Sequence, residues 1–227
     1  MELDGVTKLL EAVTKMLAVI IWPAAVLYIL ARFGSQIGEF VSNVGEMKFK
    51  GAGFEATAKR RHSEAGAALV AATVSKPEEN ATPLSTAKAA KEAVQVVGDV
   101  NTRTLRRIED SRILWVDDRP SNNEYERQAL EALGVSIVIS ASTDDALDKV
   151  RRQHFNAIIS DMGRPPDSQA GYTLLDRLRS LGHQIPFIIY AGSRSPEHQA
   201  EAMRRGAVGC TNNATELFAM VVSALSR

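Results

Sequence analysis

Only one cysteine, Cys210, occurs in the sequence, and the charges of the chain balance. A single cysteine excludes an internal disulfide and is typical of a protein in a reducing compartment. No set of Cys and His residues has the spacing of a structural zinc site. Lys plus Arg number 27, as do Asp plus Glu, and neither half of the chain has the basic excess that favours binding to phosphate backbones. We therefore expect no nucleic-acid partner.

Charged residues are also missing from a long apolar run near the N-terminus, residues 16–31. As a helix these residues span about 24 Å, slightly less than the ~30 Å hydrocarbon core of a bilayer. The flanking Lys15 and Arg32 can extend toward the membrane surfaces and compensate for the difference. The run predicts a single membrane helix within residues 1–33. A buried core helix or an interfacial helix is the alternative.

The flanks of this run predict its orientation. Lys and Arg are more numerous after the run than before it, which places the C-terminal side in the cytoplasm by the positive-inside tendency. We thus expect a single-pass membrane protein whose C-terminal part is cytoplasmic.

Residues 34–74 predict a small juxtamembrane region. Residues 47–50 alternate polar and apolar side chains as a strand does, a glycine-rich turn follows, and residues 54–57 fit a returning strand. An alanine-rich helix is predicted at residues 59–73.

Residues 75–110 predict a linker followed by a helix. Two prolines and small polar residues mark residues 75–83 as the linker. Residues 84–108 place apolar side chains on approximately one helix face. Coiled-coil pairing of two copies through residues 84–108 is one interpretation of that face, and packing on the helix's own domain is the other.

Residues 111–227 alternate short apolar runs with longer helical ones, as in an α/β domain. Short apolar strands are expected where helices cover both faces of a parallel sheet. Strands are predicted at residues 112–116, 135–139, 157–160, 186–190 and 207–210. Helices are predicted near residues 122–133, 143–153, 170–181, 196–205 and 213–225. The predicted fold class is α/β, with a doubly wound five-stranded parallel sheet.

Three acidic residues follow two of these predicted strands. Asp117 and Asp118 come directly after the first strand, and Asp161 follows the third. Ligands of parallel α/β sheets bind beyond the carboxyl ends of the strands, so the three carboxylates are expected in one crevice. A hard cation such as Mg²⁺, which takes oxygen ligands, would offset their repulsion. Helix capping by aspartate explains one of the three but not the set.

With these residues in place, residues 111–227 resemble the receiver domain of two-component response regulators. Asp117 and Asp118 match the acidic pair of that family, and Asp161 matches its phosphoacceptor. Pro165 matches a proline common in the loop after the acceptor, and Gly171 a glycine soon afterwards.

The resemblance implies a flavodoxin-like fold and a role in phosphorelay signal transduction. It implies that Asp161 is phosphorylated by a histidine kinase, and that Mg²⁺ is held by Asp117, Asp118, Asp161 and the backbone carbonyl of Gly163. A histidine kinase or another signalling protein is the expected partner.

Two positions depart from the pattern of the family. Ala191 stands where the family has a Thr or Ser whose hydroxyl meets the phosphoryl group, and Ser193 replaces it only if its loop turns inward. Asn212 stands where the family has a Lys, and an amide donates a hydrogen bond but has no charge. Two hypotheses follow: a receiver that is phosphorylated on Asp161, and a pseudo-receiver that acts as a phosphorylation-independent interaction module.

Enzyme motifs are lacking. A haloacid-dehalogenase phosphatase needs Asp-x-Asp after the first strand, whereas Asp117-Asp118-Arg119 stands there. No Gly-x-Ser-x-Gly elbow occurs, and the glycines match neither a Walker A nor a dinucleotide fingerprint. We expect a signalling protein that is not an enzyme.

Overall fold

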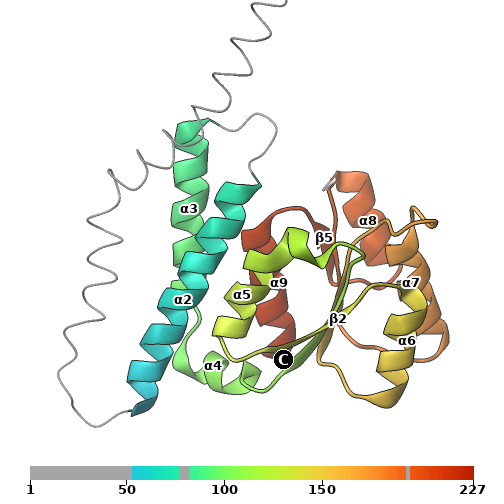
Figure 1. Ribbon diagram of the computed structural model, residues 1–227, viewed down its shortest axis with the longest axis horizontal. Helices are drawn as coiled ribbons and strands as arrows, with labels where there is room; N and C mark the ends of the chain where they lie inside the picture. The colour runs from blue at the N-terminus through green and yellow to red at the C-terminus, as the bar shows by residue number, and fades with distance from the viewer. Residues whose placement is uncertain (1–52, 77–81, 193–194) are drawn as a thin grey trace, which may run out of the picture. The chain divides into compact units, whose positions relative to one another are not determined.

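The computed structural model describes residues 53–76, 82–192 and 195–227 (Figure 1). The predicted membrane helix, the predicted strand at residues 47–50 and Ser193 lie outside these residues. Among the residues that are described, no helix is both long and apolar enough to span a bilayer.

The C-terminal part contains a five-stranded parallel sheet, as predicted. Its strands lie in the order β2-β1-β3-β4-β5, so the chain starts near the middle and winds outward in both directions. The strands are β1 (Arg112–Val116), β2 (Ser136–Ser140), β3 (Ala157–Ser160), β4 (Phe187–Tyr190) and β5 (Gly209–Thr211).

Helices cover both faces of the sheet (Figure 1). Alternate residues of β1 point to opposite sides: Ile113 and Trp115 belong to one apolar core, and Leu114 and Val116 to the other. The first core is closed by α5 (Glu124–Ala132) and α9 (Ala214–Leu225), and a 3-10 turn, η1 (Pro120–Asn123), precedes α5. The second core is closed by α6 (Thr143–Arg152), α7 (Ala170–Ser180) and α8 (Pro196–Arg204). The doubly wound architecture is thereby confirmed.

Three further helices precede the sheet, namely α2 (Gly53–Ser75), α3 (Pro83–Gly98) and α4 (Thr102–Ile108). The returning strand predicted at residues 54–57 is wrong, because these residues form the first turns of α2. The following sequence is rich in alanine, the strongest helix former, and this outweighs the short strand-like pattern. The helix predicted at residues 59–73 is confirmed as part of α2.

The single helix predicted at residues 84–108 is also wrong, since it is broken into α3 and α4. Gly98 ends α3, as expected from the low helix propensity of glycine. Asn101 then caps α4, accepting a hydrogen bond of 2.9 Å from the backbone N–H of Thr104.

Helices α2 and α3 pack on the α5 and α9 side of the sheet domain. Leu69 of α2 and Val97 of α3 are buried in the same core as Leu130 of α5 and Phe218 of α9. For α3, this is the predicted packing of a helix on its own domain, and the pairing of two copies stays a prediction.

An ion pair also connects α2 to the segment that follows α4. Arg61 donates to a carboxylate oxygen of Glu109, just after α4, at 2.7 Å. Helix α2 is therefore attached to the sheet domain by both apolar and polar contacts.

Candidate functional site: an acidic crevice

The three predicted carboxylates lie together at the carboxyl ends of β1 and β3. These strands are neighbours, and Val116 is paired with Ser160, so the aspartates that follow them come side by side. One carboxylate oxygen from each of Asp117, Asp118 and Asp161 lies within 4.8 Å of the others. The arrangement supplies the clustered oxygen ligands that a hard divalent cation takes.

Local hydrogen bonds hold Asp117 in place. Its backbone N–H donates to the carbonyl of Ser140 at 2.9 Å, and its side chain accepts from the backbone N–H of Arg119 at 2.7 Å. The second oxygen accepts from the amide of Asn123. Asp117 thus supports the turn that follows β1, which is the local role that strand-end aspartates often have. That role does not account for Asp118 and Asp161.

A cavity of about 530 Å³ opens over these carboxylates. Gly163 lines it together with the three aspartates, as do the two positions that depart from the family pattern, Ala191 and Asn212. Of the residues that the sequence assigned to the site, the structure therefore brings together all that it describes; Ser193 lies outside the described residues. Asn212 is exposed, and its amide donates a 3.4 Å hydrogen bond to the carbonyl of Gly192.

Glycine is required at position 171 by the geometry of the acceptor loop. A Cβ atom there would lie 2.6 Å from the backbone oxygen of Asp161, closer than any ordinary contact. The backbone N–H of Gly171 donates to the carbonyl of Met162 at 2.8 Å. The start of α7 thus packs directly against the acceptor.

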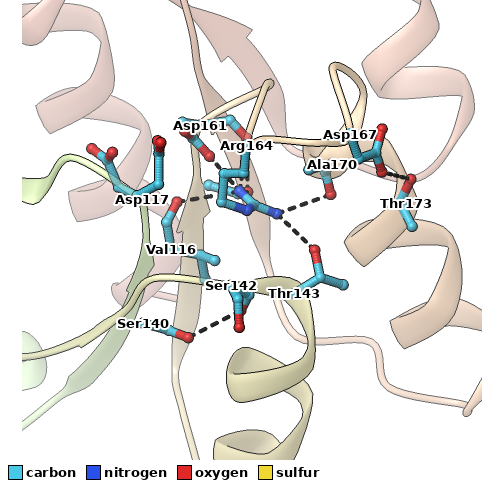
Figure 2. A network of polar contacts seen from close by, with 12 residues as sticks. Val116, Asp117, Ser140, Ser142, Thr143, Asp161, Arg164, Asp167, Ala170 and Thr173 are labelled. Carbon is cyan, nitrogen blue, oxygen red and sulfur yellow. Dashed lines mark hydrogen bonds and ion pairs between the residues drawn. The ribbon is translucent and has the colours of Figure 1, made fainter.

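Arg164 is a buried cation that the sequence reasoning missed. Its side chain is 4% exposed and points back to the strand ends, where one guanidinium nitrogen donates to Asp161 Oδ1 (Figure 2). The same nitrogen donates to Ser160 Oγ at 2.8 Å, and the other terminal nitrogen donates to Thr143 Oγ1 at 3.1 Å and to the carbonyl of Ala170 at 3.0 Å. Among the described residues its Nε has no partner. Arg164 therefore ties the acceptor to β3, α6 and α7.

The environment of Asp161 disfavours its charge. Burial raises the pKa of Asp161 to about 6. Arg164 opposes this increase through its charge and its hydrogen bond, whereas the charges of Asp117 and Asp118 add to it. At neutral pH the carboxyl is mostly ionised and can act as a nucleophile or a metal ligand.

A second cation, Lys76, reaches the crevice from the end of α2. Its ammonium donates to Glu126 at 2.7 Å and to Asn123 Oδ1 at 2.5 Å. It also lies 5.3 Å from the centre of the Tyr190 ring. Lys76 lines the same cavity as the three aspartates. No local sequence pattern indicates this contact, since Lys76 belongs to residues 75–83, which are predicted as a linker.

Glu126 is the buried centre of this second network. Its side chain is 2% exposed, and the Tyr190 hydroxyl donates to it at 2.8 Å. Burial, with the nearby charge of Glu126 and this hydrogen bond, raises the pKa of Tyr190, so the hydroxyl remains a donor. Lys76 supplies the charge that the buried carboxylate needs.

Residues 113–217 match the family model of the response regulator receiver domain. This part of the chain is a receiver domain. It is 28% identical over 109 residues to the sensor histidine kinase RcsC of Escherichia coli K12, an alignment that covers 48% of this chain and 11% of that protein. It is 32% identical over 98 residues to a gliding motility regulatory protein of Myxococcus xanthus, covering 42% of this chain and 12% of the relative. The chain thus spans only a small part of the length of these relatives.

Solved structures include similar receivers. The chemotaxis response regulator CheY4 of Vibrio cholerae is 23% identical with a TM-score of 0.45, covering 51% of this chain and 98% of that one. A Francisella response regulator receiver domain, 1452, is 20% identical with a TM-score of 0.46, covering 52% and 97%.

The residues of the receiver domain fit a magnesium ion. The donors are carboxylate oxygens close enough to share one ion, and Gly163 lines the same cavity with its backbone. A buried guanidinium already bonds one oxygen of Asp161, so a metal would share that carboxylate with Arg164.

Proposed function

We propose that the receiver domain accepts a phosphoryl group on Asp161 in a phosphorelay. Arg164 bonds Oδ1 of Asp161, which leaves Oδ2 as the nucleophile. Oδ2 attacks the phosphorus of a phosphohistidine on a histidine kinase. The O–P bond forms as the P–N bond breaks, and the imidazole nitrogen leaves with the bonding electron pair and takes up a proton from solvent. The observation that carries the proposal is the grouping of three carboxylates within 4.8 Å.

Asp117, Asp118, Asp161 and the carbonyl of Gly163 would hold Mg²⁺ in this site. The bound ion offsets the negative charge of the carboxylates and of the incoming phosphoryl group. The protein contributes position: hydrogen bonds from Arg119 and Asn123 orient Asp117. Arg164 fixes Asp161 from the opposite, buried side.

Phosphorylation by a small phosphodonor tests this proposal. With acetyl phosphate and Mg²⁺, the mass of the intact protein should increase by one phosphoryl group, and Asp161→Asn should abolish the increase. Asp148→Asn removes an exposed carboxylate on α6 and serves as the control. No increase in wild type, together with no binding of the phosphoryl mimic beryllofluoride, would refute the phosphoacceptor.

A phosphorylation-independent pseudo-receiver is the second candidate. Ala191 and Asn212 supply neither a hydroxyl nor a charge, and Arg164 already neutralises Asp161 without a phosphoryl group. In this case the fold is an interaction module, and partner binding is preserved in Asp161→Ala. Partner affinity measured with and without beryllofluoride separates the two candidates.

We further propose that the whole chain is a membrane-anchored signalling protein rather than an enzyme. Its receiver domain would lie in the cytoplasm, and its partner would be a histidine kinase or another signalling protein. Support for the anchor comes from the uncharged run at residues 16–31 and from the Lys and Arg that follow it. Alkaline carbonate should leave the full-length protein in the membrane fraction, and its release would contradict the anchor.

A further inference from the structure

Among the described residues that line the crevice, Lys76 alone comes from outside residues 113–217. It follows α2 directly and is separated by 50 positions from Glu126, the acidic partner to which its ammonium donates. Its contact with Asn123 extends the network to the metal site, because Asn123 in turn donates to Asp117. A lysine distant in sequence is thus two hydrogen bonds away from a carboxylate of the crevice.

Among the described residues, no cation of the receiver domain lines the cavity on the side of β4 and β5. Asn212 and Ala191, which follow β5 and β4, are neutral. Lys76, Tyr190 and Asn212 line this cavity and also an adjoining one of about 340 Å³. Lys76 therefore lies over the part of the crevice where Asn212 leaves no positive charge.

The ammonium of Lys76 has capacity for another ligand. It has three hydrogens, and its hydrogen bonds within the described part of the chain use two of them, to Glu126 and Asn123. Its side chain is 38% exposed, so the third hydrogen is accessible from the cavity. The base of this side chain is well fixed, because Leu69 and Ala72 of α2 are buried in the core.

We propose that Lys76 is the cation that binds the phosphoryl group held at Asp161, and that α2 thereby responds to occupancy of the crevice. The inference rests on the proposed phosphoacceptor function. A phosphoryl oxygen accepts a hydrogen bond from the third N–H of the ammonium. Its negative charge also competes with that of Glu126 for the charge of Lys76. Charge-assisted bonds of this kind are about twice as strong as neutral ones.

Two substitutions that break the same ion pair should have opposite effects. Lys76→Gln removes the ligand and should weaken beryllofluoride binding about tenfold, as expected for a hydrogen bond to a charged group. Glu126→Gln releases the ammonium from its anion and should strengthen binding several-fold. A purely structural role for the pair would shift both variants in the same direction, so this comparison separates binding from folding.

The affinities are measured on the full chain by titration of beryllofluoride in the presence of Mg²⁺, with ¹⁹F NMR reporting the bound anion. Arg60→Gln is the matched control, since Arg60 is an exposed cation on α2 that pairs only weakly with Glu64 at 3.7 Å. It should change the affinity less than twofold. Lys76→Arg keeps the charge and should recover part of the wild-type affinity.

The outcomes distinguish this inference from the function on which it rests. Absence of a bound signal in wild type would overturn the phosphoacceptor and the role of Lys76 together. A bound signal with equal affinities in wild type and Lys76→Gln would overturn the role of Lys76 alone. A decrease in both Lys76→Gln and Glu126→Gln would assign the pair to structure and likewise overturn the inference.

Discussion

Three carboxylates crowd the ends of β1 and β3, whereas β4 and β5 lead into the neutral Ala191 and Asn212. The acidic side is complete and is fixed by hydrogen bonds to Asp117 and Asp161. The neutral side depends on a lysine that enters from α2. We infer that the two sides have different tasks: the acidic side would hold the metal, while a response to a bound phosphoryl group would depend on Lys76, outside residues 113–217.

Arg164 and Lys76, two cations at the crevice, differ in the same way. Arg164 is 4% exposed and is held by several acceptors close to it in sequence or on neighbouring elements. Lys76 is 38% exposed, and its hydrogen bonds to described residues leave one N–H donor for a ligand. Arg164 is suited to fix the acceptor, and Lys76 is suited to respond to a ligand.

Removing a ligand from the acidic side should have the largest effect. Asp118→Asn should weaken Mg²⁺ binding by more than tenfold, because even residues that only support metal ligands contribute about 10- to 100-fold to affinity. Backbone NMR shifts near β1 during an Mg²⁺ titration measure this, with Trp115 fluorescence as a second readout. Asp148→Asn should titrate as wild type does. An unchanged titration in Asp118→Asn would refute the metal site.

Arg164→Met should destabilise the receiver domain by about 3 kcal/mol, since it leaves a mostly buried carboxylate without its counter-ion. The double variant Asp161→Asn, Arg164→Met should recover part of this loss, because it removes both charges. Urea unfolding of the single and double variants measures the coupling between the two residues. Additive effects would show that the ion pair contributes nothing beyond its separate members.

Arg164 and Lys76 also mark the limit of what the sequence could predict. The sequence predicts the strands, the acidic triad and the neutral positions, because each depends on a local pattern and on the common edge of a parallel sheet. The break between α3 and α4 also has a sequence signal, since Gly98 is a helix stop and Asn101 is a helix cap. The continuous apolar face at residues 84–108 favours a single helix instead. The contact of Lys76 depends on how α2 packs against α5, and no local pattern encodes that.

Acidification should weaken metal binding through Asp161, whose pKa is raised to about 6. Below pH 6 a proton competes with the metal, and Mg²⁺ affinity should fall up to about tenfold per pH unit. In the metal-free protein, acidification should instead increase the free energy of unfolding. The folded state binds the proton more tightly than the unfolded state, so the destabilisation due to the ionised carboxyl is full above pH 6 and disappears as the pH falls toward 4.

The carboxyl ¹³C shift of Asp161 measures this titration directly. Arg164→Met should move the midpoint upward, because Arg164 is the group that lowers the pKa. A midpoint near the ordinary value for aspartate in the metal-free wild type would show that burial does not control this carboxyl.

Adding a cation to the neutral side should have the smallest effect if Lys76 already supplies one. Asn212→Lys should strengthen beryllofluoride binding by only about threefold in wild type, within the range of an exposed ion pair. In the Lys76→Gln background the same substitution should restore most of the lost affinity, about tenfold. Gln128→Lys adds an equal charge to an exposed position of α5 and should do neither. If beryllofluoride produces a conformational response only in Asn212→Lys, the receiver has kept its switching machinery apart from one residue, and Lys76 does not replace it.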